Sequence, residues 1–379
     1  RKKRHWKTWN FWRKSKMLYD SYFKNPKDVP LLLDKIRKYS DKTGPVRLME
    51  ICGTHTMAIA RSGIRSILPE NVQLLSGPGC PVCVTPSNMI DMVLDLSQSP
   101  GVLITSYGDL LRVPGSVQGD SLLSRRADKG KVESVYSPMD AIKIAEEHPD
   151  TEVIFLGVGF ETTAPGTASC ILEASSRNLK NFSLLCLLKR TEPAIRSLIE
   201  SDDFAVNGFL CPGHVAAIIG ADGFSFLPED YRLPGVVSGF EPGDLLYSIL
   251  ELTEMLAQGT PELKNEYTRL VRQKGNPAAL ALMDQVFTPA ASDWRGLGQI
   301  PDSGYRIRDE YAQWDAMKKF SLAPAAEKEI PGCRCAQVIR GVMRPAECPL
   351  FKKVCSPDNP VGPCMVSGEG ACAAAYQYG

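Results

Sequence analysis

Apolar residues in the first third of the chain repeat with helical and strand periods in turn. Between positions 26 and 39, Val29, Leu32, Leu33 and Ile36 recur at the spacing of one helix face. The pattern that follows predicts a strand at 46–51, a helix at 56–67, a strand at 72–75 and a helix at 88–96. Strands that alternate with helices are typical of an open, mostly parallel α/β sheet.

Two glycine-framed turns occur where strands are predicted to end. One holds Cys52 in Cys-Gly-Thr-His, with His55 three residues on, and the other holds the Cys-x-x-Cys pair Cys80 and Cys83. Open α/β sheets bind ligands at the carboxyl ends of their strands. Because a helix N-terminus lowers the pKa of a thiol, we expect Cys80 and Cys83, ahead of the predicted helix at 88–96, to be partly thiolate.

The chain also repeats parts of its own sequence. Residues 102–115 align without gaps on 153–166, and Cys-Gly-Thr-His at 52–55 aligns on Cys-Pro-Gly-His at 211–214. Matches in a consistent arrangement indicate two related α/β halves, and clefts between domains are where sites usually lie. The turns expected to line such a cleft are 52–55, 76–86, 159–166, 211–215 and 238–243.

The segment Gly-Val-Gly-Phe-Glu-Thr-Thr-Ala-Pro-Gly at 157–166 follows a clear predicted strand at 153–156. It lacks the third glycine of a dinucleotide-binding fingerprint, and the chain contains no phosphate-binding loop of the Walker type, so nucleotide binding is weakly supported. Glu161 and Glu241 are candidate acids or hydrogen-bond acceptors in the cleft, and ordinary helix caps are the alternative. The candidate cofactor-binding residues are Glu161, Thr162, Thr163, His214 and Glu241.

His55 and His214 are two of only four histidines, and each lies in a turn with cysteine and glycine. This setting favours proton transfer or pairing with a thiolate over direct metal ligation. Cys170 and Cys186 lie in apolar helix and strand patterns, and we expect them to be inert core residues.

Half of the twelve cysteines lie near the C-terminus, among prolines and little regular structure. They are Cys333, Cys335, Cys348, Cys355, Cys364 and Cys372. Something other than an apolar core must order this segment, and thiolate ligation of a metal would do so. No histidine follows His214, so the ligands are thiolates, which suit zinc or an iron–sulfur cluster. The irregular spacing favours a 4Fe–4S cluster, with structural zinc as the alternative.

The predicted fold class is α/β: two related open parallel-sheet domains, Rossmann-like, that face a central cleft, with a loop-rich C-terminal iron–sulfur segment. Residues 244–320 look mainly helical, with a loop at 296–304. The predicted divisions are a basic tail at 1–16, a first α/β domain at 17–130, a second at 131–243, and a helical linker with the cysteine segment at 244–379.

The composition indicates the cellular compartment in which these cysteines would act. The 379 residues are 44% hydrophobic and 23% charged, without an apolar run long enough to span a bilayer and without a signal peptide. We therefore expect a cytoplasmic protein, in which cysteines stay largely reduced and serve metal or redox chemistry.

The first sixteen residues carry eight Lys or Arg, three Trp and no acidic residue. Such a tail can touch nucleic acid or an anionic membrane. We favour a misassigned start and expect no nucleic-acid partner. The rest of the chain has 36 basic and 43 acidic residues, a net charge of −7.

Six motifs together resemble the HypD family of hydrogenase maturation proteins over residues 17–379. They are Cys-Gly-Thr-His-Thr at 52–56, Gly-Pro-Gly-Cys-Pro-Val-Cys at 77–83, Gly-Phe-Glu-Thr-Thr-Ala-Pro at 159–165, Pro-Gly-His-Val at 212–215, Ser-Gly-Phe-Glu-Pro at 238–242 and the terminal cysteine run. The resemblance implies a scaffold for the Fe(CN)2(CO) unit of [NiFe]-hydrogenase. It also implies two partners, the small chaperone HypC and the cyanide donor HypE, and delivery of the iron unit by the HypC–HypD complex toward the hydrogenase large subunit.

The same resemblance implies roles for individual cysteines. Cys52, Cys80 and Cys83 would be the essential thiols and iron contacts, and Cys52 would hold the iron together with a cysteine of HypC, beside His55. The 4Fe–4S cluster would exchange electrons with Cys80 and Cys83. Its expected ligands are Cys335, Cys348, Cys355 and Cys372, with Cys364 in reserve.

A cofactor-assembly scaffold with redox activity is favoured over a turnover enzyme. The alternative is an iron–sulfur-dependent thiol/disulfide oxidoreductase, because a cluster beside a Cys-x-x-Cys pair can reduce protein disulfides. A zinc-stabilised binding module is a third possibility, and it predicts a colourless protein.

Overall fold

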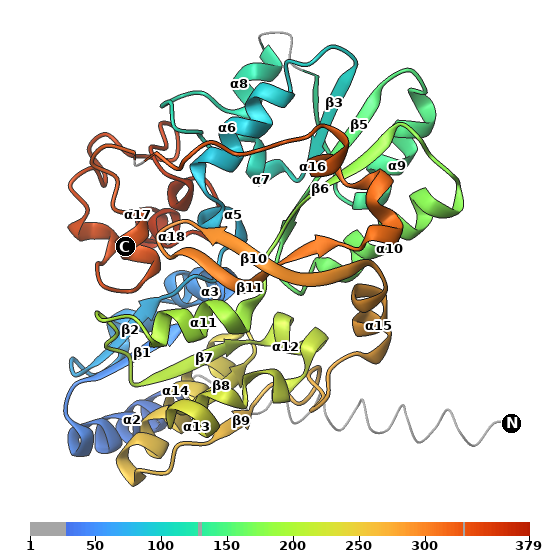
Figure 1. Cartoon of the computed structure of the whole chain (residues 1–379). Coiled ribbons are helices and arrows are strands. Elements are labelled where there is room, and N and C mark those ends of the chain that lie inside the picture. Colours follow the sequence, from blue (N-terminus) through green and yellow to red (C-terminus); the bar gives the residue numbers. More distant parts are fainter. Residues whose placement is uncertain (1–27, 128–130, 329) are drawn as a thin grey trace, which may run out of the picture. The chain divides into compact units, whose positions relative to one another are not determined.

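The computed structural model describes residues 28–127, 131–328 and 330–379 (Figure 1). Two compact units share the chain. The first unit comprises the residues up to Leu75 together with Ala205–Gly275, and the second unit comprises Ser76–Phe204 together with Asn276–Gly379. The basic tail at 1–16 lies outside the described residues.

A five-stranded sheet is the centre of the first unit (Figure 1). Its order is β2 (Val72–Ser76), β1 (Val46–Glu50), β7 (Gly208–Pro212), β8 (Gly235–Ser238) and β9 (Leu263–Asn265). The pairs β1–β7, β7–β8 and β8–β9 are parallel. Residues on both faces of β7 and β8 are buried, as expected for parallel strands.

Helices on this sheet supply the rest of the first core. They are α2 (Asp28–Thr43), α3 (Gly53–Ser62), α4 (Ile64–Ile67), α12 (Gly213–Ile219), α13 (Phe226–Tyr231) and α14 (Pro242–Gln258), with a 3-10 helix η1 (Ala221–Phe224). The helix predicted at 56–67 is two helices, because Gly63 ends α3 in the left-handed region at φ +68°. Tyr39 on α2 donates to Glu254 on α14 at 2.7 Å, and Ile36 and Leu252 are fully buried.

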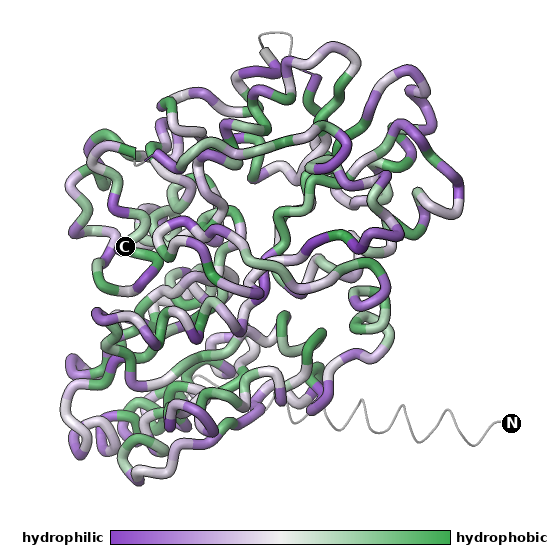
Figure 2. The backbone as a smooth tube through the Cα atoms, viewed as in Figure 1, coloured by the Kyte–Doolittle hydropathy of each residue, from purple (hydrophilic) through white to green (hydrophobic). Residues whose placement is uncertain are grey.

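A four-stranded parallel sheet is the centre of the second unit. Its order is β4 (Val132–Ser134), β3 (Val102–Ser106), β5 (Glu152–Gly159) and β6 (Phe182–Leu188). The hydrophobic run of β5 is visible in Figure 2, and Val153, Ile154, Phe155 and Leu156 have no exposed surface. The helices of this unit are α5 (Pro81–Val84), α6 (Ser87–Leu96), α7 (Gly108–Leu111), α8 (Leu122–Ala127), α9 (Pro138–Glu147), α10 (Ala164–Ser176), α11 (Thr191–Ile199) and α15 (Pro277–Val286), together with short helices near the C-terminus.

A long antiparallel hairpin follows α15 and crosses the second unit (Figure 1). Its strands are β10 (Phe287–Trp294) and β11 (Gly298–Ile307), and they pair with a register shift between Ala290 and Ser292. The prediction of a mainly helical region with a loop at 296–304 is therefore wrong here. Alternating burial along β10 selects the strand, and Gly296 and Gly298, at φ +81° and +73°, form the turn. Lys189 holds the hairpin with a hydrogen bond from Nζ to the Asp293 carbonyl at 2.7 Å.

The C-terminal segment contains only short helices, as its prolines predict. They are η2 (Asp309–Trp314), α16 (Ala316–Lys319), α17 (Cys335–Ile339), η3 (Pro345–Glu347), η4 (Pro363–Met365) and α18 (Ala371–Tyr378). No helix in the described residues is both long and apolar enough to cross a membrane.

The structure confirms an α/β protein with two parallel sheets, but the chain is divided differently from the predicted boundaries at 130/131 and 243/244. Each compact unit combines two stretches of chain. The reason is strand pairing: β1 pairs with β7, about 160 residues later, whereas β3 pairs with β4 and β5. The cleft between related domains stays a prediction.

Candidate functional site

Cys52 lies at the carboxyl end of β1, as the sequence predicts. It is the N-cap residue of α3 and is 8% exposed. The thiol therefore stands where the sheet ends and a ten-residue helix begins, a position at which the helix dipole favours negative charge.

His55 lies in the first turn of α3 and is fully buried. Its Nε2 is 3.0 Å from the Gly239 carbonyl and 3.3 Å from the Ser238 carbonyl, at the end of β8. Both partners can only accept, so Nε2 carries the proton. Nδ1 is buried and has no hydrogen-bond partner in the described part of the chain.

Burial lowers the pKa of His55 to about 4, although the bonds to Gly239 and Ser238 oppose the shift. The imidazole is therefore neutral near pH 7, and the lone pair of Nδ1 is a hydrogen-bond acceptor. This acceptor belongs to the helix turn that follows Cys52, three residues after the thiol.

An aromatic stack joins three of the predicted turns within the first unit. Phe240 lies 3.9 Å from the ring centroid of His214 and 4.7 Å from that of His55. Tyr267 meets Phe240 edge-on at 5.9 Å, and the Arg269 guanidinium covers Tyr267 at 4.3 Å. The turns at 52–55, 211–215 and 238–243 thus come together at the carboxyl ends of β1, β7 and β8.

Two buried carboxylates of the first unit were not singled out from the sequence. Asp244 pairs with Arg269 through both carboxylate oxygens. The Thr56 hydroxyl donates to the Glu50 carboxylate and lies 2.8 Å from both of its oxygens. A charged residue at the end of the apolar strand 46–51 was the available signal for Glu50. Glu241, by contrast, is exposed and is the N-cap residue of α14.

Cys211 is fully buried on β7, and burial raises the pKa of its thiol well above the usual value. The thiols of Cys170 and Cys186 have raised pKa values for the same reason, although burial raises that of Cys186 only to about 12. These three sulfurs are therefore protonated near neutral pH. Cys170 and Cys211 lie in the core, whereas Cys186 is only half-buried.

The Cys-x-x-Cys pair lies in the second unit and is a disulfide. Cys80 is the N-cap residue of the short helix α5, and its Sγ accepts from the Cys83 backbone N–H at 3.2 Å. Cys80 and Cys83 are only 5% and 2% exposed. The prediction that Cys80 and Cys83 are partly thiolate therefore applies only when this disulfide is reduced.

Glu161 is buried behind the first turn of α11. Its two oxygens accept from the Thr191 backbone N–H at 2.7 Å and from the Thr191 hydroxyl at 2.6 Å. Burial raises the pKa of Glu161, and these bonds oppose the shift. This geometry matches the helix-cap alternative. Thr162 is exposed, and Thr163 is half-buried at the start of α10. Their role in binding a cofactor stays a prediction.

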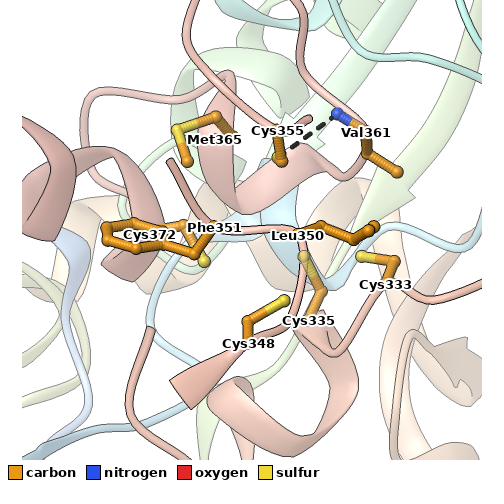
Figure 3. Close-up of a pocket in the computed structure, with 9 residues that line it drawn as sticks. All are labelled: Cys333, Cys335, Cys348, Leu350, Phe351, Cys355, Val361, Met365 and Cys372. Carbon is orange, nitrogen blue, oxygen red and sulfur yellow. Dashed lines mark hydrogen bonds between the residues drawn. The ribbon is translucent and has the colours of Figure 1, made fainter. Parts of the chain in front are cut away.

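Five of the six C-terminal cysteines line one pocket (Figure 3). Cys333, Cys335 and Cys348 lie on one side of it, and Cys355 and Met365 lie on the other. The remaining lining residues are Leu350, Phe351, Val361 and Cys372. The pocket is thus rich in sulfur and otherwise apolar.

Contacts between sulfurs and backbone order this pocket. Cys364 is buried beside it and shares hydrogen bonds with Cys335 and Cys372. The Val361 N–H donates to Cys355 Sγ at 3.4 Å. A Cβ at Gly362 would lie 2.6 Å from Cys335 Sγ, so the bare backbone there makes room for sulfur.

The cysteine sulfurs that line this pocket are suitable ligands for a metal group bound by thiolates. Soft thiolates select zinc or iron–sulfur clusters. No three His, Cys, Asp or Glu side chains in the described ranges are grouped to hold one metal ion, whereas a zinc ion needs its sulfurs at about 2.3 Å. A cluster of several irons takes one thiolate at each iron, so its ligands need not meet at a single point.

Helix α5 packs against α17 and η4. The Cys80–Cys83 disulfide therefore lies beside the segment that carries Cys335 and Cys364, within the second unit. The resemblance implies electron exchange between this disulfide and a cluster, and the structure brings the helix of the disulfide into contact with helices of the cysteine segment.

Comparison with known proteins identifies relatives of the whole described chain. The HypD family model, described as "Hydrogenase formation hypA family", matches residues 28–379. Hydrogenase maturation factor HypD of Azotobacter vinelandii is 43% identical over 369 residues, covering 96% of this chain and 97% of the relative. The HypD proteins of Rhizobium leguminosarum bv. viciae (43%; 94% and 95% covered) and Escherichia coli K12 (41%; 96% and 98% covered) are similar over comparable lengths.

Proposed function

The chain belongs to the HypD family of hydrogenase maturation factors, and from this premise we propose that it is a scaffold on which the Fe(CN)2(CO) unit of a [NiFe]-hydrogenase is assembled. The observation that carries the proposal is the meeting of the turns at 52–55, 211–215 and 238–243 around Cys52 and the buried His55. A single soft thiol donor at the end of a strand, in a turn whose histidine is neutral, suits the capture of an iron centre.

Cys52 is the proposed anchor of the iron unit. Low-spin iron with cyanide and carbonyl ligands is a soft centre, and thiolates bind such centres well. His55 contributes a neutral hydrogen-bond acceptor at Nδ1 in the turn that follows Cys52, and its low pKa means that it does not keep the proton that Cys52 loses when it binds iron. The Gly239 and Ser238 carbonyls hold the ring by its Nε2–H and so fix which nitrogen is free to accept.

Redox steps are assigned to the second unit. A 4Fe–4S cluster held in the cysteine pocket would supply single electrons, and reduction of the Cys80–Cys83 disulfide takes two electrons and two protons. Cys335, Cys348, Cys355 and Cys372 remain the proposed cluster ligands. All four line the pocket, whereas the reserve residue Cys364 does not, so Cys333 becomes the nearer substitute.

The proposed partners are HypC, which would add a second cysteine to the iron, and HypE, which would donate cyanide. The HypC complex would then deliver the iron unit to the hydrogenase large subunit. No nucleic acid takes part.

Infrared spectroscopy of the protein purified without oxygen in complex with HypC tests this function. Nitrile and carbonyl stretching bands are expected. Their absence from a complex that contains iron would contradict the proposal.

A thiol/disulfide oxidoreductase is the second candidate, because the Cys80–Cys83 disulfide lies on a helix packed against the cysteine segment. It predicts turnover of a disulfide substrate with electrons from a one-electron donor, and no nitrile or carbonyl bands.

A further inference from the structure

The tip of the β10–β11 hairpin contacts the helix that carries the disulfide. Arg295, just after β10, donates from its backbone N–H to the Val84 carbonyl at 2.8 Å and from Nε to the Thr85 carbonyl at 3.0 Å. Val84 and Thr85 directly follow Cys83 at the end of α5. The guanidinium is thereby fixed close to the disulfide turn.

The same tip lies against the C-terminal cysteine segment. A Cβ at Gly296 would approach Ala336 Cα to 2.7 Å and its Cβ to 2.8 Å, and Ala336 is the neighbour of Cys335 on α17. The hairpin tip therefore contacts both the helix that carries the disulfide and the helix that begins at Cys335.

Arg295 is a buried cation whose hydrogen-bonding capacity is not used up. It is 7% exposed, its Nε contacts a neutral carbonyl, and its Nη2 is buried without a hydrogen-bond partner among the described residues. A buried charge is costly unless an anion compensates it. Thiolate sulfur is the anion that this neighbourhood can generate.

We propose that Arg295 is a positioning residue that couples the two sulfur groups of the second unit: it holds the Cys80–Cys83 turn against the cysteine pocket and stabilises the thiolate formed when the disulfide is reduced. This role rests on the redox part of the proposed function. With glutathione as reductant, two glutathione thiols give up two electrons and become one glutathione disulfide. The Cys80–Cys83 bond breaks, one sulfur takes one of the two protons that the glutathione thiols release, the other proton passes to solvent, and the second sulfur stays anionic.

The test is the exchange equilibrium of Cys80–Cys83 in anaerobic glutathione buffers, read by thiol trapping and mass spectrometry of the peptide that contains both residues. Arg295→Gln removes the charge, and we expect the equilibrium to shift at least threefold toward the disulfide. Arg295→Lys keeps the charge and should shift it less. Arg308→Gln is the matched control, because Arg308 also donates from Nε to a carbonyl, that of Asp284, but at the other end of the hairpin.

An equilibrium constant within twofold of the unmodified protein for folded Arg295→Gln would overturn the proposal. A second pair of variants serves if Arg295→Gln does not fold. Gly296→Ala and Gly298→Ala both place a side chain at positive φ, but only the first would meet Ala336, since nothing lies within 4 Å of a Cβ at Gly298. Gly296→Ala should shift the exchange as Arg295→Gln does and Gly298→Ala should not, and equal shifts in both variants would overturn the coupling.

These measurements need neither HypC nor the iron unit. Loss of the infrared bands would therefore contradict the scaffold function without touching the exchange result, and an unchanged exchange would remove the role of Arg295 without touching the scaffold.

Discussion

The turns around Cys52 in the first unit and the cysteine pocket in the second unit are built in opposite ways. Around Cys52, regular strands and helices place one thiol, and the buried polar groups beside it are held by backbone carbonyls and by ion pairs such as Asp244–Arg269. Around the pocket, regular structure is sparse, and sulfur contacts replace it. The comparison teaches that a fold can position a single thiol through regular strands and helices, whereas a cysteine-rich segment with little regular structure is expected to depend on the metal group proposed for it.

The largest effect is expected from Cys335→Ser, which removes a proposed ligand from the pocket. We expect loss of iron and inorganic sulfide and faster proteolysis within 330–379, because regular structure is sparse there and the proposed metal group would supply much of its order. Cys170→Ala is the matched control, since Cys170 is buried within the regular helix α10. Full iron content and protease resistance in Cys335→Ser would remove the contrast between the regions.

A smaller effect, confined to the first unit, is expected from the titration of His55. The unfolded residue titrates near 6.5 and the folded one near 4, so below pH 6.5 the unfolded chain binds a proton that the folded chain does not. The contribution of His55 to stability is therefore present above pH 6.5 and falls as the pH decreases to 4, by about 3 kcal/mol at most.

His55→Gln isolates this contribution, because its amide can still donate to Gly239 and does not titrate. Denaturant unfolding between pH 4 and 7.5 should show a flatter pH dependence in this variant. Parallel curves for the variant and the unmodified protein would mean that His55 is not a buried neutral residue.

The smallest effect concerns Glu161, for which sequence and geometry suggest different roles. Thr191→Val removes the hydroxyl that donates to Glu161 and should lower the free energy of unfolding by about 1–2 kcal/mol, because a buried carboxylate loses a partner. Thr288→Val, on β10, is the control. If Thr191→Val left stability unchanged but impaired hydrogenase maturation, Glu161 would have the cofactor role predicted from its motif.

The parts of the fold that were predictable are those with a clear apolar period. The strands at 46–51 and 72–75 and the helix at 88–96 appear as β1, β2 and α6, within a residue or two at each end. The hairpin is not predictable from its local sequence, because Pro289, Ala290 and Ala291 have little strand propensity and the glycines of its turn are typical of a loop. Its strands are held by pairing with each other and by Lys189, about a hundred residues earlier.

The site was predictable where it depends on strand ends and not where it depends on distant partners. Cys52, His55 and His214 are at the turns expected of them, because parallel strands end at one edge of a sheet. Thr191 as the partner of Glu161, and Arg295 as a contact of the disulfide helix, were not predictable, because nothing in the local sequence specifies contacts made across 30 or 210 residues.

The central claim is that Cys52 anchors the iron unit, and one measurement tests it most directly. Cys52→Ala and Cys211→Ala are each purified with HypC without oxygen and compared by infrared spectroscopy. Cys211 is a fully buried thiol of the same unit. The account predicts that Cys52→Ala folds but lacks nitrile and carbonyl bands, while Cys211→Ala retains them. Bands of normal intensity in Cys52→Ala would show that the iron unit is anchored elsewhere.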